Sequence, residues 1–134
     1  LMRHRGEIWF GLDDEDLPAA QGFVGNSNLL VAPAWRLPRE LVSFTPAVAW
    51  IRERLSREYG VNAEEIWELG GRYYPSLGVT PEVVYPLAVE VQAERRAERK
   101  LSWVRLSELV RERHRLADGH LRIVVGRAAH ALGL

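Results

Sequence analysis

The strongest constraint on the fold is one helix-forming segment in the first half of the chain. Thr45 is a good N-cap residue, Pro46 suits the first helical position, and Gly60 suits the residue after the last turn. Between these ends, apolar side chains recur at helical spacing and charged side chains fall on the opposite side. The apolar face consists of Ala47, Val48, Ile51, Leu55 and Tyr59. The pattern predicts an amphipathic helix over residues 46–59 that packs against a sheet.

Short apolar runs on both sides of this segment predict strands. They occupy residues 7–12, 28–32, 66–69, 72–74, 83–91 and 101–106. Pro86 interrupts the run at residues 83–91, which indicates an edge or a bulge. The acidic run at residues 13–16, which continues to Pro18, favours a solvated loop over the alternative of a cation site.

Two further helices are expected near the C-terminal end. Ser107 is the expected cap of the first, which ends near His114, and the second follows Asp118 and ends near Leu132. Strands, one helix, more strands and terminal helices together predict the α/β class, with a mixed β-sheet and helices on both faces.

Composition narrows the class of protein further. The 134 residues suit one domain, and 18 basic residues balance 18 acidic ones, so no electrostatic footprint for nucleic acid or anionic membrane is present. The absence of cysteine excludes disulfides, thiolate zinc sites and a cysteine nucleophile. No apolar run has the roughly 20 residues that span a bilayer. We expect a cytoplasmic domain, either a whole protein or one cut from a longer chain, with no nucleic-acid or membrane partner.

Three stretches in order carry a family likeness: LVAPAWRL at residues 30–37, WIRERLSREYGV at 50–61, and AEEIWELGGRYYPSLGVTPE at 63–82. They resemble the Nudix superfamily in its ADP-ribose pyrophosphatase-like branch, whose matching patterns are LELPAGxL, REUXEEXGU (U apolar) and LGxxYPSPGxxDE. The ending WVRLSEL…LADGH is similar to the family's WVPLDEL…DGKT. The likeness covers about two-thirds of the chain. It implies a Nudix-type α/β/α sandwich, Mg²⁺- or Mn²⁺-dependent cleavage of a pyrophosphate by box glutamates, and a homodimer.

The box itself departs from the family pattern. With Gly60 as the anchor, the Arg-Glu pair of the box falls on Glu53 and Arg54, and its Glu-Glu pair falls on Arg57 and Glu58. Hard cations need carboxylate oxygens, and each exchange of glutamate for arginine replaces an attraction with a repulsion. The sequence therefore predicts a degenerate box without its metal. Glu58 is then expected to form an ion pair with Arg54, which lies four residues earlier.

Other positions of the likeness also have counterparts in the family pattern. Trp35 replaces the glycine of the family's PAG turn, and Glu40 is the nearest counterpart of the upstream box glutamate. The residues that match the family's substrate-facing stretch are Tyr73, Tyr74, Ser76 and Glu82. The resemblance implies a nucleotide-side pocket there, and the alternative is a Gly/Pro turn packed by two tyrosines.

The function hypothesis is a Nudix-fold domain without hydrolase activity or cofactor, acting as a module that binds a nucleotide derivative or another protein. One alternative is a divergent Mg²⁺- or Mn²⁺-dependent hydrolase of a nucleoside diphosphate derivative such as ADP-ribose, using Glu58 with Glu40 or Glu82. A second alternative is a structural or dimerisation domain, or one that contacts the rest of a larger protein. The number of carboxylates that converge on the helix distinguishes these alternatives.

Overall fold

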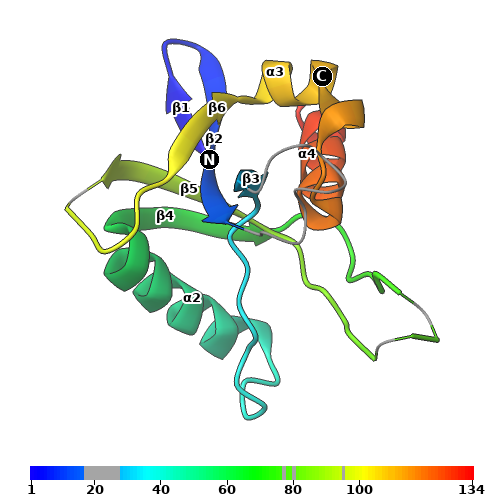
Figure 1. Cartoon of the computed structure of the whole chain (residues 1–134). Coiled ribbons are helices and arrows are strands. Elements are labelled where there is room, and N and C mark those ends of the chain that lie inside the picture. Colours follow the sequence, from blue (N-terminus) through cyan, green and yellow to red (C-terminus); the bar gives the residue numbers. More distant parts are fainter. Residues whose placement is uncertain (17–27, 77, 80, 95) are drawn as a thin grey trace.

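The computed structural model describes residues 1–16, 28–76, 78–79, 81–94 and 96–134 (Figure 1). The chain combines helices with antiparallel sheets, which confirms the α/β class. In order, the elements are β1 (Met2–His4), β2 (Glu7–Asp16), β3 (Asn28–Val31), α2 (Phe44–Tyr59), β4 (Val61–Glu68), β5 (Leu87–Glu94), β6 (Ser102–Arg105), α3 (Leu106–Arg111), the 3-10 helix η2 (Arg113–Arg115) and α4 (Gly119–Ala131). Pro18 at the end of the acidic run, and Leu77 and Thr80 of the stretch at residues 63–82, lie outside the described residues.

Strand β2 is the centre of the larger sheet. It pairs antiparallel with β1, with β6 through Trp9 to Leu12, and with β3 through Asp13 to Asp16. Strands β4 and β5 form a separate antiparallel pair with two register shifts. The two sheets meet at Leu1, whose nitrogen donates to the Val89 carbonyl and whose carbonyl accepts from the Val91 N–H, the pattern of a parallel pair. Every assigned ladder in the described part of the chain is antiparallel, so the mixed β-sheet expected from the sequence is not confirmed there.

Two hydrophobic cores hold the helices to these sheets. In the first, α3 and α4 pack on β2 through the buried side chains Phe10, Leu12, Leu106, Leu109, Leu121, Val125 and Ala128. In the second, α2 packs on β4 and β5 through Ile51, Leu55, Tyr59, Val61, Ala63 and Val91. Burial of each large aliphatic side chain contributes roughly 1.5–3 kcal/mol. In Figure 1, α2 lies beneath β4, and α4 lies beyond the opposite end of the β4–β5 pair. The two helices therefore stabilise different parts of the molecule.

The main helix agrees with its predicted apolar face but begins earlier. Its N-cap is Ser43 instead of Thr45, and Pro46 lies in the first turn, where a missing N–H breaks no helical hydrogen bond. Gly60 ends the helix as expected: its φ of 65° is left-handed, and its N–H donates to the Ser56 carbonyl over 3.1 Å. The helix therefore delivers its last turn, with Glu58 and Tyr59, to the start of β4.

Three other predicted segments have different boundaries or a different structure from those expected. Residues 13–16 are not a solvated loop, because β2 continues through them and pairs with β3. The predicted strand at residues 83–91 begins only at Leu87, since Pro86 has no N–H for a ladder; its carbonyl accepts from Leu69 N–H instead. Residues 72–74 form only an isolated bridge between Tyr73 and Val84.

Of the two C-terminal helices, the first begins differently from the prediction, and the second begins after Asp118 as expected. Helix α3 starts at Leu106 with Arg105 as its cap residue, so Ser107 lies inside it. Helix α4 is capped by the Asp118 side chain, which accepts from the N–H groups of His120 and Leu121. No helix in the described part of the chain is both long and apolar enough to cross a bilayer.

Candidate functional site

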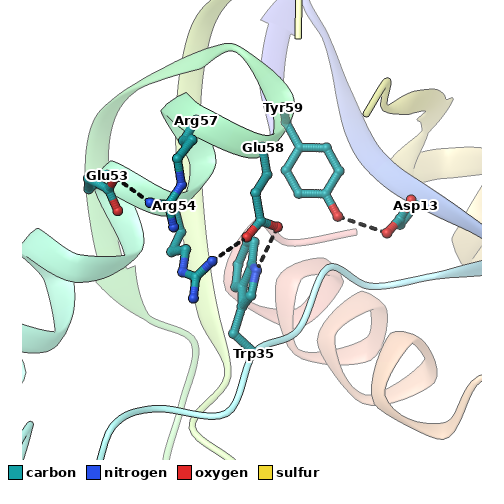
Figure 2. Close-up of polar contacts among 7 residues, drawn as sticks. All are labelled: Asp13, Trp35, Glu53, Arg54, Arg57, Glu58 and Tyr59. Carbon is teal, nitrogen blue, oxygen red and sulfur yellow. Dashed lines mark hydrogen bonds and ion pairs between the residues drawn. The ribbon is translucent and has the colours of Figure 1, made fainter. Parts of the chain in front are cut away.

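The candidate site lies at the C-terminal end of helix α2, where the motif residues gather (Figure 2). One oxygen of Glu58 accepts from Arg54 Nη1 over 2.8 Å, and the other accepts from Trp35 Nε1 over 3.0 Å. The hydrogen bond from Trp35 is the main cause that lowers the pKa of Glu58; partial burial opposes it, and Arg54 reinforces it. The predicted Arg54–Glu58 ion pair is confirmed, and both carboxylate oxygens are engaged by protein donors.

The other two box positions form a second, separate pair. Arg57 lies 3.4 Å from Glu53, and their side chains are 57% and 58% exposed. Figure 2 shows this pair on a different side of the helix from Glu58. Arg57 therefore does not share the face of Arg54 and Glu58, because Arg57 and Glu58 are adjacent and neighbouring residues of a helix point about 100° apart around its axis.

A buried carboxylate lies beside the box and was missed at the sequence level. Asp13, only 5% exposed, accepts a hydrogen bond of 2.8 Å from the Tyr59 hydroxyl and forms an ion pair with Arg99. Burial is the main cause that raises the pKa of Tyr59, and the hydrogen bond and charge of Asp13 add to it. This hydroxyl therefore stays protonated and acts as a donor to Asp13.

Arg99 and Trp35 join the two carboxylates into one network. The backbone N–H of Arg99 donates to the backbone carbonyl of Glu58 over 2.9 Å. The guanidinium of Arg99 lies 5.5 Å from the centre of the Tyr59 ring. The Trp35 ring meets the Tyr59 ring edge-on at 6.1 Å. The network thus contains two acids and two arginines together with two aromatic rings, so its formal charge is balanced within the protein.

Glu40 lies before helix α2, and in the described part of the chain it is not among the hydrogen-bond or ion-pair partners of Glu58. It is exposed in the turn before α2, where its carbonyl accepts from Val42 N–H. Fourteen residues of helix separate Phe44 from Glu58, which at about 1.5 Å per residue is roughly 21 Å. Glu82 is exposed in the connection between β4 and β5. Across the described ranges, no group of three or more His, Cys, Asp or Glu side chains is arranged to hold a metal.

The predicted ligand residues are spread along the β4–β5 connection. Tyr73 is half-buried, and its hydroxyl lies 2.5 Å from Nδ1 of His120. Tyr74 is 46% exposed, and the Ser76 carbonyl accepts from Val79 N–H over 3.2 Å in a tight turn. Only Tyr73 therefore has a fixed partner on the body of the protein among these residues. His120, like Asp13, is a residue for which the sequence predicted no such contact.

Comparison with known proteins adds no family assignment. No protein-family model matches the chain, and no curated protein matches it.

Proposed function

We propose that this chain is a Nudix-like domain without hydrolase activity, which binds a nucleotide derivative or a protein partner through the connection at residues 73–82. The observation that carries the proposal is the engagement of both Glu58 oxygens by Arg54 and Trp35. The family likeness at residues 30–37, 50–61 and 63–82 supplies the class of ligand.

The energetic argument concerns the metal that such a reaction needs. A divalent ion at Glu58 has to displace the Arg54 guanidinium from 2.8 Å and then lie beside its positive charge. The indole N–H of Trp35 cannot bind a cation, because it is a donor only. Each 1.36 kcal/mol of lost transition-state stabilisation lowers the rate tenfold, so a site without its metal loses many orders of magnitude.

Hydrolysis assays test this proposal directly. The chain is incubated with ADP-ribose, NADH or nucleoside triphosphates in the presence of Mg²⁺ or Mn²⁺, and product is measured by chromatography. We expect no release above the metal-only control. Metal-dependent turnover at ordinary enzyme rates would overturn the proposal and favour the divergent hydrolase with Glu58 and Glu40 or Glu82.

A matched pair of variants tests the metal argument. Arg54→Glu removes the guanidinium from Glu58 and adds a carboxylate one helical turn away, whereas Arg57→Glu adds the same charge beside Glu53 on the solvent side. Titration calorimetry with Mn²⁺ should show tighter binding for Arg54→Glu than for Arg57→Glu. Equal affinity for the two variants would mean that Arg54 does not exclude the cation.

Ligand binding is tested with ADP-ribose as the probe. Tyr74 is exposed within residues 73–82, and Tyr85 is exposed just outside them. Titration calorimetry should show binding that weakens in Tyr74→Ala and is unchanged in Tyr85→Ala. Binding that is insensitive to Tyr74→Ala would remove this connection from the proposal.

A role in protein interaction is supported by exposed apolar side chains on the same connection. Val79 is 81% exposed, and Tyr74 and Tyr85 are also open to solvent. Such side chains, when they cluster, mark interaction surfaces. If a second copy of the chain is the partner, sedimentation equilibrium should show a dimer that dissociates in the variant Val79→Ser. A monomer over the whole concentration range would exclude the homodimer.

A further inference from the structure

Arg127 on helix α4 holds the base of the β4–β5 connection, residues 69–86. Its Nη1 donates to the backbone carbonyl of Leu69 over 3.1 Å and to the backbone carbonyl of Gly71. Its guanidinium lies over the Tyr73 ring, with 5.4 Å between Cζ and the ring centre. All of these partners are neutral. The guanidinium is therefore fixed in position, and its positive charge has no counter-charge among the described residues.

The first turn of the connection is folded closely around this guanidinium. Gly70 has a left-handed φ of 77°, and a Cβ at this position would lie 3.3 Å from Arg127 Nη1 and 3.4 Å from its Cδ. Both the φ and the close approach favour glycine here. The Tyr73 hydroxyl lies 2.5 Å from Nδ1 of His120, so the Tyr73 ring is held to the same helix whichever of the two groups donates. The connection and α4 together thus set the position of the guanidinium.

The two carbonyls use only one nitrogen of the guanidinium. Nη1 carries two hydrogens, and each has its own carbonyl acceptor. The remaining donors, Nε–H and Nη2–H, lie side by side as a fork that matches two oxygens of one oxyanion. Within the described residues this fork has no protein partner. It is open to solvent, since the buried and unpaired side-chain N–H groups in that part of the chain belong to Trp9 and Arg54.

We propose that the Nε–Nη2 fork of Arg127 binds a phosphate group at the base of the β4–β5 connection. A phosphate group offers paired oxygens and negative charge, so it receives two charge-assisted hydrogen bonds from the fork. The side chain is already ordered by its carbonyl partners, so it loses little conformational freedom on binding. That the phosphate belongs to a nucleotide derivative rests on the proposed function, whereas the fork itself does not depend on that function.

The carboxylates near this cluster do not neutralise Arg127. Burial, followed by the charge of Asp118, raises the pKa of Tyr73; Arg127 opposes them and Glu82 adds to them. Asp118 is already engaged, because its oxygens accept three backbone N–H groups. Glu82 is exposed, so solvent screens its charge. Neither carboxylate forms an ion pair with Arg127 where the structure describes the chain, and exposed Arg72 adds a positive charge directly after the turn.

Guanidinium N–H resonances of the intact chain test the fork, with inorganic pyrophosphate as the probe. They are recorded by heteronuclear NMR at slightly acidic pH, where these protons exchange slowly enough to be observed. The matched control is Arg122, which is exposed on the same helix. Arg127→Lys and Arg122→Lys assign the two Nε–H resonances, because each variant lacks one of them. Pyrophosphate should shift the Arg127 resonance saturably and the Arg122 resonance far less. No saturable shift at Arg127, or equal shifts at both, would overturn the proposal.

The same two variants separate the fork from positive charge alone. Arg127→Lys keeps the charge and can still donate to a carbonyl, but it has no fork. Titration calorimetry should show pyrophosphate binding about tenfold weaker or more in Arg127→Lys and unchanged in Arg122→Lys. Equal affinity in the two variants would contradict the fork. Protection of the Tyr73 and Val84 amides, which donate to each other's carbonyls, checks that the base stays folded; if it does not, the wild-type resonance shifts decide.

Two further probes identify the source of the oxyanion. Acetate that binds as tightly as pyrophosphate would show a carboxylate site and overturn the assignment to phosphate. ADP-ribose should shift the Arg127 Nε–H resonance in the same direction as pyrophosphate does. ADP-ribose that binds without this shift would overturn the inference and leave the proposed function standing. Pyrophosphate binding at Arg127 without any ADP-ribose binding would support the fork and count against the proposed function.

Discussion

The end of helix α2 and the β4–β5 connection contrast in how their polar groups are satisfied. At the helix end, Asp13 and Glu58 are each bonded to an arginine and to an aromatic donor within the protein. On the connection, Tyr74, Val79 and Glu82 are exposed. The polar groups at the end of helix α2 are thus satisfied within the protein, whereas the β4–β5 connection presents side chains to solvent.

The two regions therefore differ in what we expect their side chains to do. Charged groups that satisfy each other inside the protein are costly to remove singly, because the remaining partner is left without its counter-charge. Exposed side chains contribute little to stability and remain available to a partner. Variants at the helix end should therefore change the free energy of unfolding, and variants on the connection should change binding.

The largest expected effect is that of Asp13→Ala. This change leaves the Tyr59 hydroxyl without its acceptor and Arg99 without its ion pair, and we expect a loss of about 2–3 kcal/mol in the free energy of unfolding, because Arg99 keeps some contact with water. Urea denaturation measures it. The matched control is Asp14→Ala, an exposed position on the same strand, with a change below about 0.5 kcal/mol. Similar values for the two variants would contradict the closed network.

A smaller effect, with a defined pH dependence, is expected for Glu58→Gln. The pKa of Glu58 is lowered in the folded state, so its charge stabilises the protein fully above the ordinary value of 4.5, and this contribution disappears as the pH falls through the folded pKa. At pH 7 we expect a loss of about 1 kcal/mol. Denaturation between acid and neutral pH should show the difference from wild type shrinking toward acid.

The control for this pH dependence is Glu53→Gln. Glu53 pairs with Arg57 in full contact with solvent, so the change should be close to zero at every pH. A loss in Glu58→Gln that stays constant down to acid pH would show that the charge of Glu58 is not the stabilising feature.

Arg54 and Arg57 allow a comparison of a partly buried and an exposed ion pair on the same helix, α2. Arg54→Ala removes the ion pair to Glu58 and the stacking of the guanidinium on the Trp50 ring at 4.8 Å, so we expect a loss of about 1 kcal/mol. Arg57→Ala removes only an exposed pair, and we expect less than about 0.5 kcal/mol. Thermal and urea denaturation both measure the difference. A larger loss for Arg57→Ala would reverse the assignment of the two faces.

The sequence predicted much of this arrangement because local rules decide it. The apolar face of α2, its left-handed end at Gly60, and the Arg54–Glu58 pair follow from helical spacing and from the freedom of glycine. The beginning of the helix did not follow, because two favoured cap residues, Ser43 and Thr45, lie two positions apart and spacing does not choose between them. The N-cap is extended at Ser43 and makes no side-chain bond, so tertiary packing decides that boundary.

The sequence patterns did not predict contacts between residues that are far apart in the chain. Asp13 belongs to a run of four acidic residues, and nothing local separates a buried member from solvated ones; its partners Tyr59 and Arg99 come from two other segments. The Tyr73–His120 contact spans 47 residues and has no periodic signal. One cue was present for Asp13: the apolar strand at residues 7–12 continues into the acidic run without an intervening glycine or proline turn.

The smallest expected effect on stability is that of Tyr74→Ala. Nearly half of the Tyr74 side chain is exposed, so its removal should change the free energy of unfolding by less than about 0.5 kcal/mol. Urea denaturation of the wild type and the variant at neutral pH measures this. The result matters for the binding test, because weaker ADP-ribose binding by a variant of unchanged stability reports a lost contact with the ligand. A loss above about 1 kcal/mol would mean that Tyr74 packs like the residues at the helix end. The contrast between the closed helix end and the open connection would then fail, and binding data on this variant would no longer distinguish ligand contact from structure.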